Sequence, residues 1–270
     1  MKIAFLGGGN MATALIGGLL ARGFAPGALS VIERLEAARA ALATGYGVHA
    51  SGGADDATRA ADVLVLAVKP QDMRTALAPL AHVVRDKLVV SIAAGVRLAD
   101  IARWLGGHRR LVRAMPNTPA LVGAGVAALY AAPEVGAEER ASAERILGAV
   151  GKTVWVEAET LLDPVTALSG SGPAYVFWFI EQLAAAGAAL GLPLETARTL
   201  ALETVLGAAQ LAARSGEPAS VLRERVTSKG GTTEAALRVF AEERLAERLR
   251  RALEAASRRG AELGEQLGRD

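Results

Sequence analysis

Short, wholly apolar runs alternate with helical patterns through the first 157 residues of the chain. The clearest run, residues 63–68, has six apolar residues and no polar alternation, which is typical of a strand buried on both faces of a sheet. Similar strands are expected at residues 2–6, 29–32, 48–50, 88–92, 111–114, 126–130 and 154–156. Strands that alternate with helices predict an α/β fold with a doubly wound, mainly parallel sheet.

Beyond residue 157 only helical patterns remain. They cover residues 161–168, 174–190, 196–214, 218–225 and a last stretch from 234 to near the end. The 196–214 segment is apolar on both faces, since Leu202 and Leu206 lie opposite the stripe that contains Leu200 and Leu211. A helix of this kind must be buried on both faces, and a helical dimer interface would bury it.

The first strand leads directly into a glycine-rich turn and a helix. Gly7, Gly9 and Ala12 match the three small positions of the G-x-G-x-x-G/A pattern. Gly7 permits the tight reversal, Gly9 lets a pyrophosphate approach the backbone, and Ala12 lets the helix pack closely on the strand. The helix N-terminus directs its N–H groups at the phosphates. We therefore expect a Rossmann-type dinucleotide-binding domain over residues 1–160, followed by an all-helical dimerisation and substrate-binding domain over residues 161–270.

Composition narrows the classes of function. The 270 residues carry a net charge of +2 with no clustered basic run, so no nucleic-acid partner is expected. The chain has no cysteine, which excludes disulfides and thiolate chemistry and favours a cytoplasmic protein. Its three histidines are far apart and are interpreted as surface or loop residues, so no metal site is expected. Glu181 and Gln182 interrupt the apolar stretch 173–194, which favours a buried helix over a membrane span.

Polar, glycine-containing stretches stand out from the alanine- and leucine-rich background at residues 115–119, 169–175 and 226–233. The first follows a strand, at the sheet end where ligands bind in this architecture. The other two precede helices, where hydroxyls and free N–H groups suit a carboxylate. Serine and threonine also cap helices with no further role. Two such loops beside a cofactor domain favour the binding interpretation.

These motifs together resemble the pyrroline-5-carboxylate reductase family. The resemblance runs in consistent order from residue 2 to about 263, through residues 7–12, 67–70, 91–95, 113–119, 169–175, 203–207 and 226–237. It implies reduction of L-1-pyrroline-5-carboxylate to L-proline with NADPH or NADH, the last step of proline biosynthesis. It also implies a homodimer with interlocking helical domains, sometimes assembled into a ring of dimers, a homodecamer. Each active site would then lie between one subunit's nucleotide domain and its neighbour's 226–233 loop.

The resemblance also assigns residues to the site. The cofactor would be held by Leu6, Gly7, Gly8, Gly9, Asn10, Met11, Ala12, Ala67, Val68, Lys69, Pro70, Ile92, Ala93, Ala94 and Asn117. The substrate carboxylate would be held by Ser228, Gly230, Gly231, Thr232 and Thr233, with the Thr233 hydroxyl near the ring nitrogen as the candidate catalytic group. Glu159 matches an acidic position on the substrate side.

Glu33 and Arg34 end the second strand, where the adenosine ribose of the cofactor is contacted in this architecture. An acidic residue there hydrogen-bonds the ribose 2′-OH, whereas an arginine accommodates a 2′-phosphate. The two residues therefore favour opposite cofactors. Our hypothesis is that Glu33 favours NADH.

The helical half is short of proton-transfer side chains. Lys229 is the only lysine after Lys152, and no histidine follows His108. Hydride transfer involving a carbonyl usually employs such a group, whereas a protonated imine is electrophilic without one and needs mainly positioning. The composition therefore favours an imine reductase. Two alternatives stay open: a related two-domain dehydrogenase of a small hydroxy or amino acid, and a non-catalytic dinucleotide-binding regulator.

Overall fold

The computed structural model describes residues 1–269, which form two compact units. One comprises Met1–Ser171 together with the chain from Ala255 onward, and the other comprises Gly172–Glu254. The expected division into functional domains at residue 160 stays a prediction.

The first unit is built on one eight-stranded sheet. Its strand order is β3-β2-β1-β4-β5-β6-β7-β8, and all neighbouring pairs are parallel except β6 and β7. The strands are β1 (Ile3–Leu6), β2 (Leu29–Ile32), β3 (His49–Ser51), β4 (Val63–Leu66), β5 (Leu88–Ser91), β6 (Leu111–Met115), β7 (Gly125–Ala131) and β8 (Gly151–Trp155). The prediction of a mainly parallel sheet is confirmed.

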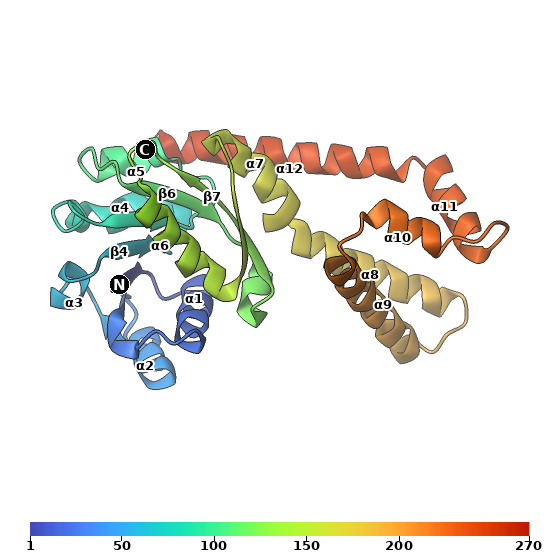
Figure 1. Cartoon of the computed structure of the whole chain (residues 1–270), viewed down its shortest axis with the longest axis horizontal. Helices are drawn as coiled ribbons and strands as arrows, with labels where there is room; N and C mark the ends of the chain where they lie inside the picture. The colour runs from blue at the N-terminus through green and yellow to red at the C-terminus, as the bar shows by residue number, and fades with distance from the viewer. Residues whose placement is uncertain (270) are drawn as a thin grey trace. The chain divides into compact units, whose positions relative to one another are not determined.

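Both faces of the sheet are buried, which explains the continuous apolar runs. In β1, Ile3 and Phe5 join one hydrophobic cluster, while Ala4 and Leu6 join the cluster on the opposite face. Residues of α1 (Asn10–Ala21), α2 (Glu36–Tyr46) and α6 (Ala137–Leu147) complete the first cluster. Residues of α4 (Met73–Leu77) and α5 (Leu98–Trp104) complete the second. Figure 1 shows these helices on the two sides of the sheet, as a doubly wound fold requires.

Shorter helical elements connect the strands and lead out of the sheet. They are η1 (Pro26–Ala28), α3 (Asp56–Arg59), η2 (Pro70–Asp72), η3 (Ala78–Leu80), η4 (Thr118–Val122), η5 (Gly148–Val150), η6 (Glu159–Leu161), α7 (Leu162–Val165) and the π-helix η7 (Thr166–Gly170). The helix expected at 161–168 is thus α7 continued by a π-helical turn.

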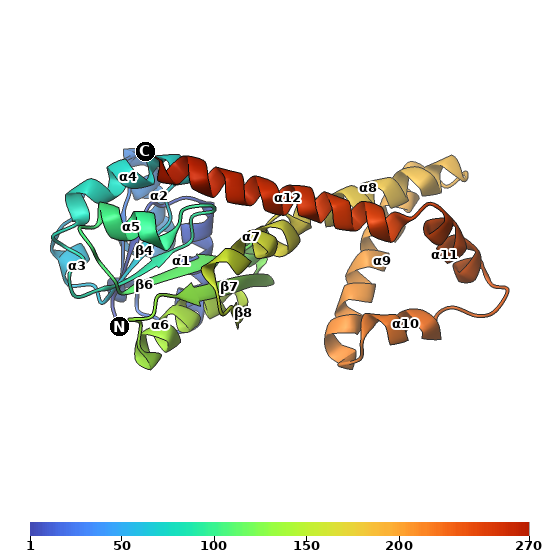
Figure 2. The same cartoon turned by 90° about the horizontal axis from the view of Figure 1, so that it is seen from above.

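The second unit is entirely helical. It contains α8 (Gly172–Ala189), α9 (Leu194–Ser215), α10 (Ala219–Arg225), α11 (Thr232–Glu242) and the first residues of α12 (Leu245–Gly268). Figure 2 shows α12 as one continuous helix. Pro173 lies in the first turn of α8, as expected.

The prediction of a single helical stretch from residue 234 is wrong, because the helix is interrupted between α11 and α12. Arg244 adopts φ = 54° there, in the left-handed region. That conformation normally favours glycine, so neither glycine nor proline marks the break in the sequence. Across residues 1–269, no helix combines the length and the apolar character needed to cross a bilayer.

Candidate active site

The glycine turn between β1 and α1 has the geometry of a phosphate site. Gly7 has φ = 98°, and its N–H donates to the Ile32 carbonyl at 2.8 Å. A Cβ on Gly7 would lie 2.8 Å from the Ala67 carbonyl oxygen, so the fold itself requires this glycine. Gly9 differs, since a Cβ there would meet no atom of residues 1–269 within 4 Å apart from Gly9 itself and its two chain neighbours. The space beside Gly9 and the free first turn of α1 therefore fit a dinucleotide pyrophosphate.

Three neighbouring parallel strands bring the other cofactor candidates to the same edge of the sheet. The Ala67 N–H donates to the Leu6 carbonyl at 2.8 Å, and the Ile92 N–H donates to the Leu66 carbonyl at 3.1 Å. Residues 6–12, 67–70 and 92–94 thus follow β1, β4 and β5 side by side. The chain order reverses between β1 and β4, and ligands of open α/β sheets bind at such a switch point.

Glu33 is fixed against the glycine turn. Its Oε2 accepts from the Gly8 N–H and its Oε1 from the Leu35 N–H, each at 2.9 Å. Arg39 Nη1 donates to the carbonyls of Glu33 and Arg34 at 2.9 and 2.8 Å. The Glu33 carboxylate is therefore held in place at the end of β2, whereas Arg34 is exposed.

The Asn117 side chain is occupied by partners within the protein. Its Nδ2 donates to the Ser169 carbonyl at 3.1 Å, and its Oδ1 accepts from the Val126 N–H at 2.9 Å. The amide thus joins β7 to the π-helix, with the residue only 9% exposed. Its predicted contact with the cofactor stays a prediction.

Glu159 lies in the first unit, where it contacts charged and polar groups that the sequence reasoning missed. Its Oε1 accepts from the Leu98 N–H at 2.8 Å and from Arg113 Nη1 at 3.1 Å. Asp163 lies next to it and accepts from Arg97 Nη2 at 2.6 Å. Burial lowers the pKa of Arg113, and the nearby Glu159 carboxylate opposes that shift. The sequence signal that could have indicated these contacts is Arg113 itself, an arginine inside the otherwise apolar strand β6.

The hydroxyl loop, residues 226–233, lies in the second unit between α10 and α11. The Gly231 N–H donates to the Ser228 carbonyl at 3.0 Å, which closes a turn, and Gly230 adopts φ = 72°. A Cβ on Gly231 would lie 2.5 Å from the Ser228 hydroxyl, so a larger residue there would force the Ser228 side chain to move. The Gly230 N–H is already bound to Glu234 Oε2 at 2.7 Å.

The first turn of α11 is open to an anion. Gly231 occupies the N-cap position, so no cap side chain accepts from the N–H groups that follow it. The hydroxyl-bearing residues Ser228 and Thr232 are exposed, and Thr233 is half-buried. Hydroxyls and free N–H groups at a helix N-terminus can hold a carboxylate. The structure therefore gathers the substrate candidates, except Glu159, in this loop.

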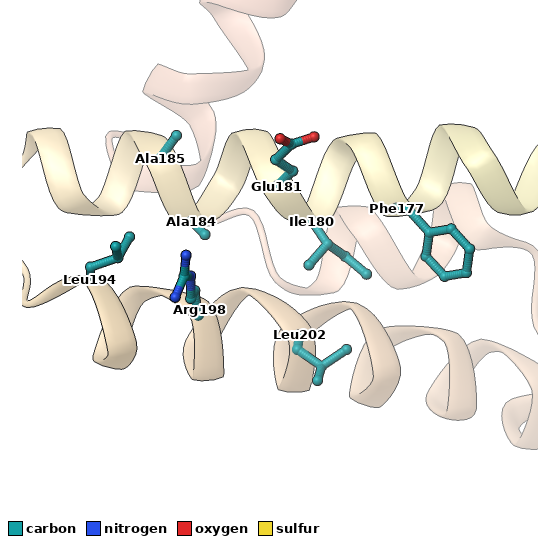
Figure 3. Close-up of a pocket in the computed structure, with 8 residues that line it drawn as sticks. All are labelled: Phe177, Ile180, Glu181, Ala184, Ala185, Leu194, Arg198 and Leu202. Carbon is teal, nitrogen blue, oxygen red and sulfur yellow. The ribbon is translucent and has the colours of Figure 1, made fainter.

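The second unit also contains an apolar groove of about 580 Å³ between α8 and α9. Figure 3 shows Ile180 directed from α8 toward α9 and Arg198 directed from α9 toward α8, with Leu202 farther along α9. Phe177 and Leu194 also line the groove. Apolar side chains dominate this lining, so the groove suits packing rather than proton or hydride transfer.

Comparison with known proteins decides the family. The model of the pyrroline-5-carboxylate reductase dimerisation family matches residues 159–263, and that of the F420-dependent NADP oxidoreductase family matches residues 2–95. The pyrroline-5-carboxylate reductase of Pseudomonas aeruginosa is 45% identical over 268 residues, which cover 99% of this chain and 98% of the relative. The chain belongs to the pyrroline-5-carboxylate reductase family.

Solved structures agree with this membership. A pyrroline-5-carboxylate reductase from Coxiella burnetii superposes with a TM-score of 0.93 at 42% identity, covering 97% of this chain and 98% of that one. The NADP-bound pyrroline carboxylate reductase of Plasmodium falciparum has a TM-score of 0.83 at 27% identity, covering 98% of each chain. In this chain the glycine turn falls within the oxidoreductase match and the hydroxyl loop within the dimerisation match.

Proposed function

We propose that this chain reduces L-1-pyrroline-5-carboxylate to L-proline with NADPH or NADH, the last step of proline biosynthesis. The observation that carries the proposal is the 45% identity to a pyrroline-5-carboxylate reductase over nearly the whole of both chains. The intact glycine turn and hydroxyl loop supply sites for the two ligands that this reaction needs. Because the identity spans both, the proposal does not depend on fold alone.

The chain's own residues act by binding and orientation. The open space at Gly9 and the N-terminus of α1 receive the pyrophosphate. The first turn of α11 and the Ser228 and Thr232 hydroxyls hold the substrate carboxylate, and the Thr233 hydroxyl lies near the ring nitrogen. When bound, the cofactor would supply the hydride for the imine carbon, and the π electrons of the C=N bond would pass to nitrogen. A protonated imine needs no strong acid from the protein, and Thr233 has only to hold the nitrogen in place.

For the cofactor, we propose a preference for NADH set by Glu33. Its carboxylate is fixed by two backbone N–H groups at the end of β2. A fixed negative charge there accepts from a ribose hydroxyl and repels a 2′-phosphate. Arg34 is exposed and offers the opposing attraction.

For the assembly, we propose a homodimer formed through the helical unit, with a ring of dimers as the larger form. Large apolar side chains on α8 and α9 are exposed in the single chain, including Phe177 at 66%, Trp178 at 59% and Leu206 at 46%. Exposed apolar surface of this extent marks a protein interface. The cysteine-free sequence suits the cytoplasm, where we place the enzyme.

The test follows oxidation of NADH and NADPH with pyrroline-5-carboxylate, for the wild type and Thr233→Ala. Turnover in the wild type that falls at least tenfold in the variant, with cofactor affinity unchanged, supports the reaction and the role of Thr233. Thr44→Ala is the control, since Thr44 is an exposed residue of α2, outside both the hydroxyl loop and the helices proposed for the dimer. A wild type that binds cofactor but never turns over would favour the non-catalytic regulator. Turnover only with a hydroxy or amino acid would favour the related dehydrogenase.

A further inference from the structure

Four charged side chains of the first unit form a linked cluster near the cofactor edge of the sheet. Arg97 bonds Asp163 at 2.6 Å, Arg113 bonds Glu159 at 3.1 Å, and Arg113 Nη2 lies 4.0 Å from Asp163 Oδ1. The side chains of Arg113 and Asp163 are only 2% and 10% exposed. Burying charges is costly unless they are paired. Each acid is therefore held firmly by its arginine.

The cluster holds the end of the loop that follows β5. Leu98 is the first residue of α5, and its N–H donates to the same Glu159 oxygen that accepts from Arg113. A carboxylate in this position also complements the positive end of the helix dipole. The residue before it, Arg97, is bound to Asp163. Two consecutive loop residues are thus fixed by two acids from the 159–163 segment.

The middle and the beginning of the loop are fixed by other contacts. The Ile92 N–H is bonded to the Leu66 carbonyl. Gly95 adopts φ = 80° and packs against Gly264 of α12, with the Leu267 side chain nearby. Between these points Ile92 is half-buried, Ala93 is buried and Ala94 is exposed. The 92–94 segment, which we assign to the cofactor, therefore presents one exposed residue between anchored ends.

We propose that Glu159 is a positioning residue for the nicotinamide cofactor, acting by holding Leu98 and Arg113 together so that the 92–94 segment keeps its binding conformation. The inference rests on the proposed function for the identity of the ligand. It replaces the substrate-side role that the family resemblance implied for Glu159, because the carboxylate already accepts from two donors of its own unit.

The test measures the dissociation constants of NADH and NADPH for the full chain without substrate, by calorimetry. For Glu159→Ala we expect both constants to rise about tenfold. For Glu159→Gln we expect a smaller rise, since the amide oxygen still accepts from the Leu98 N–H. Glu157→Gln is the matched control on an exposed neighbouring position and leaves both constants unchanged. At saturating cofactor, the KM for pyrroline-5-carboxylate stays at its wild-type value in Glu159→Gln.

If Glu159→Ala is destabilised, hydrogen exchange of individual peptides can still test the proposal. We expect faster exchange in peptides covering residues 92–98, with the β1 and β4 peptides unchanged. A normal cofactor constant with a raised substrate KM would restore the substrate-side role and overturn the proposal. If exchange in Glu159→Ala is faster throughout the chain and Glu159→Gln binds cofactor normally, Glu159 contributes to stability only, and the proposal is overturned. A wild type that binds NADPH without oxidising it contradicts the proposed function only, because the binding comparison still decides the role of Glu159.

Discussion

Gly264 of α12 lies against Gly95 so closely that a Cβ on Gly264 would come within 2.9 Å of the Gly95 carbonyl oxygen. The same Cβ would be 3.2 Å from Arg97 Nε. Four residues earlier in the helix, a Cβ on Gly260 would meet only the Asp163 Cβ, at an ordinary 4.0 Å. A methyl group therefore fits at Gly260, whereas at Gly264 it would clash with the Gly95 loop.

This difference predicts opposite effects of the same substitution. Gly260→Ala should raise the free energy of unfolding by about 0.5–1 kcal/mol, since alanine favours helix. Gly264→Ala should lower it by about 1–3 kcal/mol, because the added methyl overpacks the contact with Gly95. Urea denaturation measures both. Equal stabilisation by the two substitutions would mean that α12 does not pack closely on the loop.

The glycine turn allows binding to be separated from folding. Gly9→Ala should leave the melting temperature unchanged, because the Cβ enters open space, but should weaken NADH and NADPH binding at least tenfold, or about 1.4 kcal/mol. Gly7→Ala should instead destabilise the fold by more than about 1 kcal/mol, since its φ is 98° and its Cβ would clash with Ala67. Thermal melts and calorimetric titrations of both variants check this. Normal cofactor affinity in Gly9→Ala would exclude the turn as the pyrophosphate site.

Cofactor preference should respond to the two residues at the end of β2 in opposite directions. Glu33→Gln removes the charge but keeps an acceptor for the Gly8 N–H, so the ratio of NADPH to NADH affinity should rise about tenfold. Arg34→Ala should lower that ratio, since it removes the cation available to a 2′-phosphate. Binding titrations with each cofactor give the ratio directly. A wild type with a large NADPH preference would refute our assignment of Glu33.

Acid should remove the stabilisation contributed by Asp55, the N-cap of α3. Burial raises the pKa of Asp55, but hydrogen bonds from His49 and Thr58 lower it by more. The net result is a pKa of about 2, against an ordinary 3.8. A lowered folded-state pKa contributes stability above about pH 3.8, which is lost as the pH falls toward 2. Asp55→Asn should cost less than about 1 kcal/mol at pH 7, because the side chain is partly exposed. Denaturant midpoints of Asp55→Asn and the wild type, measured from pH 7 downward, should converge near pH 2. A difference that stays constant over this range would contradict the prediction.

A dimer through the helical unit predicts that Trp178→Glu weakens self-association. Placing a charge among apolar interface side chains should raise the dimer dissociation constant about thirtyfold, or about 2 kcal/mol. Sedimentation velocity over a concentration series measures it. Ala141→Glu, on an exposed position of α6, is the control. Unchanged association of Trp178→Glu would place the contact elsewhere.

The sheet could be predicted well from the sequence because burial of a strand on both faces produces a continuous apolar run in the local sequence. Each of the eight strands lies within three residues of an expected run, and Gly7, Gly9 and Ala12 fall at the β1–α1 junction as anticipated. Short-range patterns of this kind require no knowledge of distant residues.

Features that depend on contacts between residues distant in the sequence produce no such local pattern. Arg113 and Glu159 are paired although they are far apart in the sequence, and no periodicity connects them. The left-handed Arg244 ends α11 without a glycine, and the π-helical turn before α8 has no established sequence signal. Glu159 was singled out only by family resemblance, so its partners became visible only in the fold.

The anchoring of the 92–98 loop has a consequence for how the protein folds. Residues near Gly95 are synthesised before Glu159, and Gly264 is synthesised well after both. Contacts between such distant positions close large loops of chain, and they slow folding. The strands beneath the loop can pair first, whereas the loop reaches its final packing only after Gly264 has been synthesised. A chain truncated before Gly264 would therefore keep the sheet-forming sequence but lack this contact.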